Sequence, residues 1–266
     1  MSADADATVP APRPIPGETH EIRRLLPDAA RTTVAEQLHG LDLKPLAKPD
    51  RPYLILNFVT TLDGRATIDG KSGQIGSETD TEMLQRLRTR VDAVMIGAGT
   101  MRAERYGRIV SDPQLRAYRE RTGLAHDPLA VLISNRFELP WDAGLFTDGG
   151  GRIVIFTASD KEPPETATPV TVVRHPDGVR LDGALEWLRK ERGIRSVLCE
   201  GGPTLHGRLR EGGLADELFL TIAPKIAGGE APRILEGALP DVDVVDLAWL
   251  LDSESELFAR YRGMSD

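Results

Sequence analysis

The sequence predicts an α/β fold in which a single mixed, mostly parallel sheet is flanked by helices. Short apolar runs bounded by glycine or proline recur from residue 51 onward. Amphipathic stretches of helical period separate them, an alternation typical of strands joined by crossover helices. Near the end of the chain, segments 242–251 and 255–262 indicate a closing antiparallel pair. We therefore expect one large domain over residues 51–266.

Continuous apolar runs identify the expected strands. Such runs, without polar alternation, are typical of parallel strands covered by helices on both faces. The weakest of them is VTVV (170–173). The others are PYLILNFVT (52–60), VDAVMIGAGT (91–100), DPLAVLIS (127–134), RIVIFTA (152–158), IRSVLCE (194–200) and DELFLTIAPKIAG (216–228).

Three helices are expected between these strands. Segment 77–89 places apolar residues at helical spacing and has a capping-box spacing that starts at Thr79. A second helix opens at residue 181 and closes at Gly193, a residue suited to a helix end. A third, over 203–211, begins with a proline, whose missing N–H costs nothing at the first helical position.

The first fifty residues differ in character from the rest. Residues 1–18 are rich in Ala, Pro and Asp, which is typical of a disordered tail. Residues 19–50 space apolar side chains such as Ile22, Leu25 and Leu26 in a way compatible with short helices. We interpret this second segment as a helical extension packed on the main domain.

Composition and charge argue against several classes of protein. A formal net charge of -8 argues against a nucleic-acid surface, which needs clustered positive charge. The single cysteine, Cys199, allows no intramolecular disulfide or cysteine-based zinc site and fits a reducing cytoplasm. The histidines lack metal-ligand spacing, so no metal is expected. No apolar run approaches the roughly 18 residues of a membrane span, and no secretion signal is visible.

The clearest candidate site is the strand-to-helix turn in VLCEGGPTLHGRLREGG (197–213). Gly201 and Gly202 allow a sharp bend or a close approach of the backbone to a ligand. The N–H groups at the start of the next helix favour an anion such as phosphate. Glu200 ends a buried run, so its carboxylate needs a hydrogen-bond partner or a ligand. His206 fits the surface or a cofactor edge better than the role of a base.

A second glycine turn, IGAGTMR (96–102), follows another expected strand. Arg102 stands where a dinucleotide-binding fingerprint needs a small residue, so a purely structural turn fits equally well. Ligands of open α/β sheets bind beyond the carboxyl ends of strands, where both glycine turns would lie. After a further strand, Ser134, Asn135 and Arg136 either hold a ribose 2′-phosphate or form a solvated loop.

Four segments together resemble the reductase domain of the bifunctional riboflavin-biosynthesis deaminase–reductase family. They are RPYLILNFVTTLDGR, VDAVMIGAGTMRAE, VLCEGGPTL and ADELFLTIAPKIAGG, in matching order from about Arg51 to the C-terminus. The resemblance implies a dihydrofolate-reductase-like fold, NADPH as cofactor and a homodimer. It also implies reduction of the ribose of 5-amino-6-(5-phosphoribosylamino)uracil to a ribityl chain. One cysteine cannot build the zinc motif of the deaminase half.

The resemblance further implies roles for individual residues. Asp63 and Glu200 become candidate catalytic carboxylates, although Asp63–Gly64 is also an ordinary turn dipeptide. Asn57, Ser72, Arg88 and Glu200 are expected to bind substrate, with Arg88 a partner for the substrate phosphate. In the alternative reading, Arg88 only complements the dipole of its helix. The expected cofactor-binding residues are Thr61, Gln74, Gly97, Gly99, Thr100, Glu104, Ser134, Arg136, Gly201, Gly202, Pro203, Thr204, Leu205 and Gly207.

The chain departs from the family pattern at several positions. Asn57 stands where the family usually has lysine, and Gln74 where it has a cofactor-stacking tryptophan. Glu104 and Tyr106 replace an aspartate and a proline. Ser111 replaces a substrate-binding arginine, which removes a charge-assisted contact worth about 1.5–3 kcal/mol. The cofactor half is therefore better preserved than the substrate half.

The leading hypothesis is an NADPH-dependent reductase that transfers a hydride to a carbonyl- or imine-type carbon of a pyrimidine or pterin. One alternative keeps the scaffold and takes dihydrofolate or another pterin. A second is a non-catalytic NADPH-binding protein, which the loss of lysine at Asn57 favours. A third is a secondary-metabolism reductase of a related heterocycle.

Overall fold

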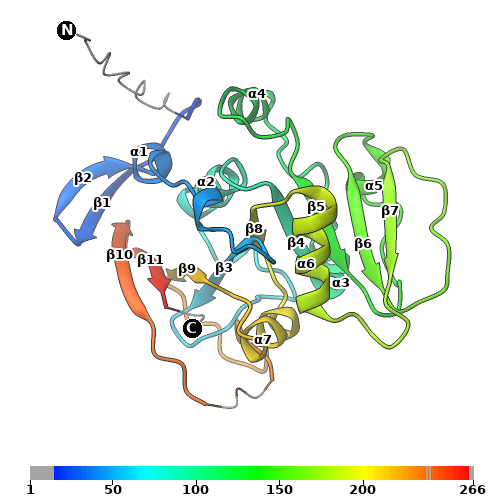
Figure 1. Cartoon of the computed structure of the whole chain (residues 1–266). Coiled ribbons are helices and arrows are strands. Elements are labelled where there is room, and N and C mark those ends of the chain that lie inside the picture. The colour runs from blue at the N-terminus through cyan, green and yellow to red at the C-terminus, as the bar shows by residue number, and fades with distance from the viewer. Residues whose placement is uncertain (1–14, 238, 240, 264–266) are drawn as a thin grey trace, which may run out of the picture.

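The computed structural model describes residues 15–237, 239 and 241–263, which fold around one eleven-stranded sheet (Figure 1). The strand order is β2-β1-β10-β11-β9-β3-β8-β4-β5-β6-β7. From β9 to β7 all neighbours are parallel, and the pairs from β2 to β9 are antiparallel. The predicted mixed, mostly parallel sheet with flanking helices is confirmed.

The elements alternate along the chain much as the sequence indicates. The helices are α1 (Val34–His39), the 3-10 turn η1 (Lys44–Leu46), α2 (Glu78–Arg88), α3 (Ala98–Glu104), α4 (Pro113–Arg121), α5 (Gly144–Thr147), α6 (Leu181–Arg192) and α7 (Pro203–Glu211). The strands are β1 (Glu21–Leu26), β2 (Ala30–Thr33), β3 (Tyr53–Thr61), β4 (Ala93–Gly97), β5 (Leu129–Ile133), β6 (Ile153–Thr157), β7 (Val170–Arg174), β8 (Ser196–Cys199), β9 (Glu217–Ala223), β10 (Asp246–Ser253) and β11 (Glu256–Arg262).

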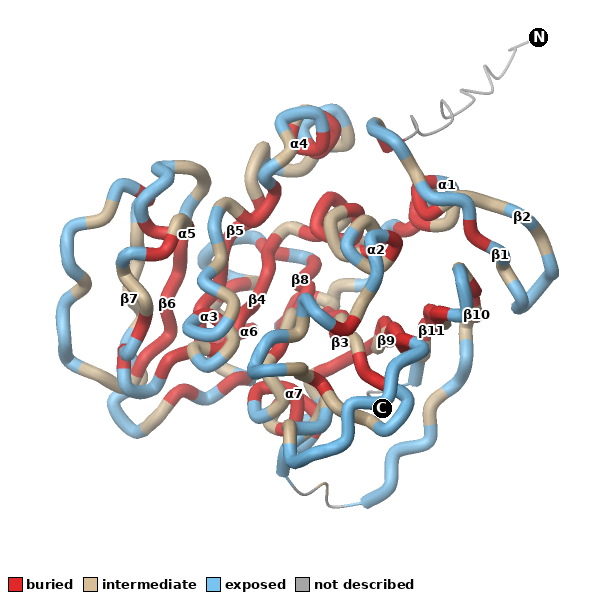
Figure 2. The backbone as a smooth tube through the Cα atoms, turned by 180° about the vertical axis from the view of Figure 1, so that it is seen from behind, coloured by how far each residue is buried: buried red, intermediate tan, exposed pale blue. Residues whose placement is uncertain are grey.

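Each face of the parallel strands has its own apolar core, and the central strands are buried along their length (Figure 2). Along β3, Ile55 belongs to one core, and Leu54 and Leu56 to the other, because successive side chains of a strand point to opposite faces. Helices α2, α3 and α4 cover the first core, and α6 and α7 cover the second. This double cover explains why the strands read as continuous apolar runs.

Helix termini follow the predicted chemistry with one correction. Helix α7 begins at the expected proline, and α6 ends at Gly193 in the left-handed conformation, with φ 64°. The N-cap of α2 is Ser77 and not Thr79: the Ser77 hydroxyl accepts a hydrogen bond from the Asp80 N–H at 3.3 Å. Thr79 is buried at 6% exposure, so its side chain faces the protein interior instead of capping the helix.

The expectation of a helical extension over residues 19–50 is wrong in its first half. Strands β1 and β2 form a hairpin there, and β1 joins the sheet by pairing with β10. Only α1 and the turn η1 are helical. Tertiary hydrogen bonding to β10 thus overrides the local spacing of Ile22, Leu25 and Leu26, of which Ile22 alone is buried.

The expected N-terminal tail falls largely outside the described residues. Its last four residues, 15–18, are described. Ile15 is 4% exposed within the first core, and the carbonyls of Pro16 and Glu18 accept hydrogen bonds from Arg86 at 3.2 and 2.9 Å. These contacts attach the end of the segment to the first core and to α2.

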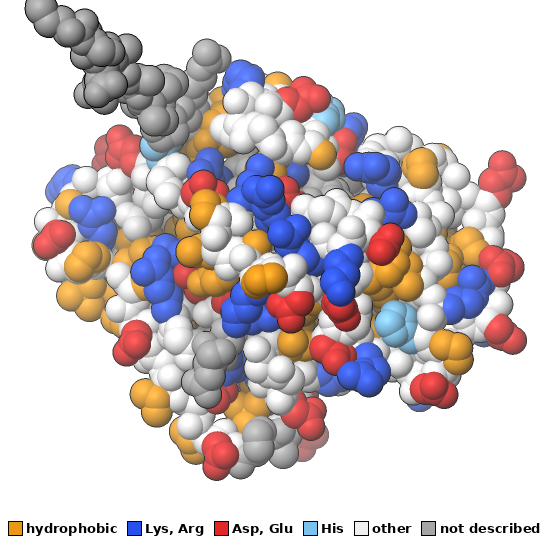
Figure 3. Space-filling model, viewed as in Figure 1, with side chains coloured by type: hydrophobic (Ala, Val, Ile, Leu, Met, Phe, Trp, Pro, Cys, Tyr) orange, Lys and Arg blue, Asp and Glu red, His pale blue; other side chains and the backbone are white. Residues whose placement is uncertain are grey.

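Acidic and basic side chains are interspersed on the face shown in Figure 3, with Lys and Arg prominent across its middle. Charges of both signs are therefore dispersed on this face. In the part of the chain that the structure describes, no helix has both the length and the apolar character needed to cross a membrane.

Candidate active site

A cavity of about 560 Å³ opens beyond the carboxyl ends of the parallel strands. Segments following β4, β5 and β8 line it, together with the second half of β3 and the loop that follows β3. The two glycine turns meet here, since the Gly97 N–H donates to the Gly201 carbonyl at 2.7 Å. The sequence-based expectation that both turns share one sheet edge is thus confirmed.

Close packing at this junction explains the glycines. Gly201 has a φ of +96°, and a Cβ there would lie 3.0 Å from the Phe58 ring. A Cβ on Gly202 would lie 2.7 Å from the Thr100 hydroxyl oxygen, too close for any side chain. Neither Gly202 at the start of α7 nor Gly97 at the start of α3 makes a side-chain cap, so backbone N–H groups at both helix starts lack a capping side chain.

Glu200 has a protein partner, Arg88. The Arg88 Nε and Nη2 atoms each donate to a Glu200 carboxylate oxygen at 2.7 Å, and Nη1 donates to the Ile109 carbonyl at 2.9 Å. Arg88 does not line the cavity, and both edges of its guanidinium are hydrogen-bonded within the protein. The structure therefore does not place Arg88 where it was expected, as a free partner for the substrate phosphate. Burial of Tyr106, followed by the charge of Glu200, raises the pKa of Tyr106 well above its usual value.

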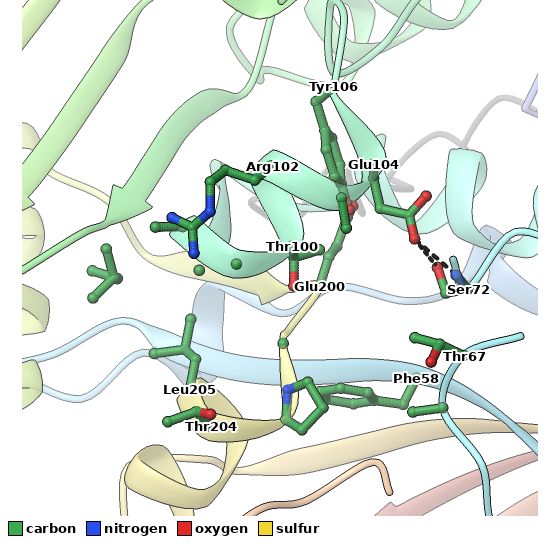
Figure 4. Close-up of a pocket in the computed structure, with 18 of the residues that line it drawn as sticks. Phe58, Thr67, Ser72, Thr100, Arg102, Glu104, Tyr106, Glu200, Thr204 and Leu205 are labelled. Carbon is green, nitrogen blue, oxygen red and sulfur yellow. Dashed lines mark hydrogen bonds between the residues drawn. The ribbon is translucent and has the colours of Figure 1, made fainter. Parts of the chain in front are cut away.

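Ser72 and Glu104, expected on substrate and cofactor respectively, bond to each other (Figure 4). The Ser72 N–H and hydroxyl both donate to Glu104 Oε1, at 2.8 and 2.9 Å. This ties the loop after β3 to the end of α3. In Figure 4, Arg102 points to the other side of the cavity, away from Glu104 and Ser72.

The charges that line the cavity are distributed unevenly. Arg102, Arg136 and Arg208 are its cationic lining residues in the described part of the chain. Arg136 follows β5, whereas the lining carboxyl of Asp80 bonds Thr221 of β9, across three intervening strands. The lining arginines therefore gather toward β5, with Glu138 among them, and the lining residue near β9 is the carboxyl of Asp80.

The model of the RibD C-terminal domain family matches residues 52–254. The chain belongs to the RibD C-terminal domain family. It is 31% identical over 194 residues to the 2,5-diamino-6-ribosylamino-4(3H)-pyrimidinone 5′-phosphate reductase of Archaeoglobus fulgidus, covering 70% of this chain and 87% of that one. The resemblance noted in the sequence is thereby confirmed.

Other relatives agree with this RibD C-terminal assignment. The Escherichia coli riboflavin biosynthesis protein RibD is 30% identical over 203 residues, covering 74% of this chain but only 54% of its own length. A pyrimidine reductase-like protein from Corynebacterium diphtheriae has the same fold, with a TM-score of 0.68 and 24% identity, covering 84% of this chain and 95% of that one. This RibD C-terminal domain is accordingly an oxidoreductase of the pyrimidine reductase type.

Most residues expected at the site line the cavity of this RibD C-terminal domain. Those that do not are Thr61, Asp63, Gln74, Arg88, Gly201 and Gly207. Those that do are Asn57, Ser72, Gly97, Gly99, Thr100, Glu104, Ser134, Arg136, Glu200, Gly202, Pro203, Thr204 and Leu205.

Asp63 anchors a loop instead of facing the cavity. Its carboxylate accepts hydrogen bonds from the Thr61 hydroxyl at 2.6 Å and from the Ala227 and Gly228 N–H groups at 3.1 and 2.7 Å. The Thr61 bond, supported by the two backbone bonds, lowers the pKa of Asp63 to about 2. The structure therefore places this carboxylate outside the lining residues, in hydrogen bonds that anchor the loop.

Gly207 and His206 face away from the cavity as well. A Cβ on Gly207 would lie 2.0 Å from the Glu236 carbonyl oxygen, so this glycine accommodates a loop and not a phosphate. His206 is 2% exposed, donates from Nδ1 to the Ile234 carbonyl at 2.7 Å and stacks on Phe58 at 4.6 Å. Burial lowers its pKa to about 4. Its expected surface or cofactor-edge position is therefore wrong.

Asp80, in the first turn of α2, is a lining carboxyl that sequence reasoning missed. Burial raises its pKa to about 6; a hydrogen bond from Thr221 opposes the rise and the charge of Glu256 adds to it. An acidic residue in a first helical turn normally only complements the helix dipole, which hides its role. The spacing of four residues between Asp80 and Leu84 places both on one face of α2, and the structure shows that both line the cavity.

Proposed function

We propose that this protein is an NADPH-dependent reductase that reduces the ribosyl carbon of a phosphorylated ribosylaminopyrimidine in riboflavin synthesis. Membership of the RibD C-terminal domain family supports the reaction class, and the name of the Archaeoglobus relative, a 2,5-diamino-6-ribosylamino-4(3H)-pyrimidinone 5′-phosphate reductase, supports the substrate. The observation that carries the proposal is the junction of two glycine turns at the mouth of one cavity. Such a junction suits an extended dinucleotide.

The residues present fit a dinucleotide. Helix α7 starts with Pro203, Thr204 and Leu205 beside the cavity and has no side-chain cap, so its first N–H groups suit a pyrophosphate. Ser134, which is 3% exposed, and Arg136 lie at the end near β5, where a ribose 2′-phosphate would be held. When bound, the nicotinamide supplies a hydride.

The protein's own contribution to this chemistry is positioning and proton supply. Reduction of an imine-type carbon adds a hydride at carbon and a proton at nitrogen. Asp80 lines the cavity and has its pKa raised to about 6, so it holds a proton to higher pH than an ordinary aspartate does. The Arg88–Glu200 pair fixes one wall, and the Ser72–Glu104 bond fixes another.

The test is loss of NADPH absorbance when purified protein receives 5-amino-6-(5-phosphoribosylamino)uracil, its 2,5-diaminopyrimidinone counterpart or dihydrofolate in parallel. Turnover of either phosphorylated pyrimidine supports the proposal. Cofactor binding without turnover of any of the three overturns it and leaves a non-catalytic NADPH-binding protein.

One observation favours dihydrofolate or another pterin as a second candidate substrate. The lining cations are Arg102, Arg136 and Arg208, and Arg88 is committed to Glu200. Ser111, which stands where the family has an arginine, is absent from the lining residues. A substrate phosphate at the far end would therefore meet no cation among the described lining residues. Exclusive turnover of dihydrofolate would establish this candidate.

A homodimer and a cytoplasmic location complete the proposal. Ile226, Val242 and Val244 are 79%, 91% and 85% exposed, and this apolar surface is what a partner copy would cover. The free thiol of Cys199 supports a reducing compartment. Sedimentation of the purified chain as a monomer would overturn the dimer, and a disulfide-linked form in cells would count against the compartment.

A further inference from the structure

Asp80 lies close to a second buried carboxyl, Glu256, that does not line the cavity. Glu256 begins β11, is 3% exposed, and its charge acts on Asp80. A Cβ on Gly76 would lie 2.1 Å from Asp80 Oδ2, so the Asp80 carboxyl folds back over the backbone before α2. Ser77, one residue on, bonds Glu256. The segment before α2 therefore brings the two carboxyls together.

Hydrogen bonds are distributed unequally between the two carboxyls. The Ser77 N–H donates to Glu256 Oε1 at 3.2 Å, and the Ser77 hydroxyl donates to Glu256 Oε2. Asp80 receives only the bond from Thr221. Burial raises the pKa of Glu256, and the two Ser77 bonds and the charge of Lys225 oppose that rise. Donors that point at a carboxylate favour its ionised form, so this distribution favours the negative charge on Glu256 and the proton on Asp80, the member that lines the cavity.

We propose that Glu256 is a positioning residue that keeps the proton of this carboxyl pair on Asp80, ready for transfer to the reduced substrate. Two like charges close together in a buried site do not both ionise readily, so the pair titrates as a unit. The charged group that acts on Glu256 is Lys225, whose Nζ donates to the Gln74 carbonyl at 2.9 Å. Glu78 of α2 and Glu254 before β11 are exposed.

The transfer of the Asp80 proton to the reduced substrate rests on the proposed function. As the hydride forms a C–H bond at the imine carbon, the C=N π pair moves to nitrogen. Nitrogen takes the proton from the Asp80 carboxyl, whose O–H bond breaks. The substrate is reduced and the nicotinamide oxidised. Solvent then returns one proton to the Asp80–Glu256 pair.

The decisive experiment titrates the carboxyls directly in the full chain, without cofactor or substrate. Carbon-13 labelling of aspartate and glutamate side chains gives the Asp80 and Glu256 signals, which Asp80→Asn and Glu256→Gln identify by their loss. In Glu256→Gln, we expect the Asp80 midpoint to fall by about one pH unit. Glu254→Gln, in the exposed turn before β11, is the matched control and should leave the midpoint unchanged.

An Asp80 midpoint that does not move in Glu256→Gln overturns the proposal. So does a wild-type titration in which Glu256 holds the proton to higher pH than Asp80. If Glu256→Gln fails to fold, Ser77→Ala replaces it, because losing one donor to Glu256 also draws the proton away from Asp80. Activity is measured separately. If the wild type turns over substrate, the fall of kcat with rising pH should begin at lower pH in Glu256→Gln. If it does not turn over substrate, the proposed function fails, but the titration still shows which carboxyl of the pair holds the proton.

Discussion

Arg88, the last residue of α2, and Glu200, which follows β8, form a buried bidentate ion pair although they are 112 positions apart in the chain. Their side chains are 9% and 3% exposed. The pair gives the carboxylate that ends a buried strand the partner it requires, and it fixes α2 against the strand-to-helix turn of the site. A buried pair of this kind is costly to break from one side, because the surviving charge stays desolvated.

Glu200→Gln should therefore lower the free energy of unfolding by about 3–5 kcal/mol, since it leaves the Arg88 charge buried and uncompensated. Urea denaturation at neutral pH measures the loss. Arg88→Met added to Glu200→Gln should recover part of it, as in a double-mutant cycle. Asp142→Asn, which removes the exposed partner of Arg105, is the control and should leave stability unchanged. If Glu200→Gln and Asp142→Asn lowered the free energy of unfolding by the same amount, the buried pair would have no special role in stability.

Gly202→Ala should weaken NADPH binding at least about tenfold, or about 1.4 kcal/mol. The new Cβ would lie 2.7 Å from the Thr100 hydroxyl oxygen, so Thr100 and the start of α7 must shift. Fluorescence titration with NADPH gives the affinity, and far-ultraviolet circular dichroism checks the fold. Gly40→Ala, where a Cβ meets nothing within 4 Å, should bind NADPH as the wild type does. Unchanged affinity in Gly202→Ala would remove α7 from the cofactor site.

Asp80→Asn should raise stability and abolish most turnover at the same time. The folded-state pKa of Asp80 is raised to about 6, so folding favours its neutral form. Stability from this group is present at low pH and is lost as pH rises between about 4 and 6. At pH 7 the ionised group costs up to about 3 kcal/mol, which the amide avoids.

Turnover by the wild type should fall as pH rises through about 6, since Asp80 must be protonated to donate. We expect Asp80→Asn to lose about 10²-fold or more in kcat while keeping its NADPH affinity. Measured pH–rate profiles and chemical denaturation at pH 5 and about pH 8 check both effects. A fully active Asp80→Asn would place the proton source elsewhere.

Arg136→Ala should reduce NADPH affinity and leave NADH affinity unchanged. Arg136 lines the end of the cavity near β5 beside the buried Ser134, where a 2′-phosphate would be held. Only NADPH carries that phosphate, so the ratio of the two dissociation constants isolates the contact. Arg105→Ala, which removes a cation paired with Asp142 away from the lining residues, serves as the control. Equal losses for the two cofactors would assign Arg136 to another part of the ligand.

Local sequence determined most of the sheet and its helices. Continuous apolar runs gave the buried strands, and Gly193 and the proline at residue 203 marked helix ends where the structure has them. Helix α4 was missed because its buried face includes Arg116 and Arg119, whose charges break the apolar period. The hairpin β1–β2 was missed because its partner strand β10 lies more than two hundred residues away. Periodicity reports local burial, and it says nothing of distant pairing.

The sequence by itself also determined the glycine turns, the lining residues Ser134 and Glu200, and the family to which the chain belongs. Only the tertiary structure decided which charges oppose one another. It joins Arg88 to Glu200 and sets Asp80 near Glu256. A side chain's proton affinity depends on burial and on partners from distant segments, and packing alone brings these together.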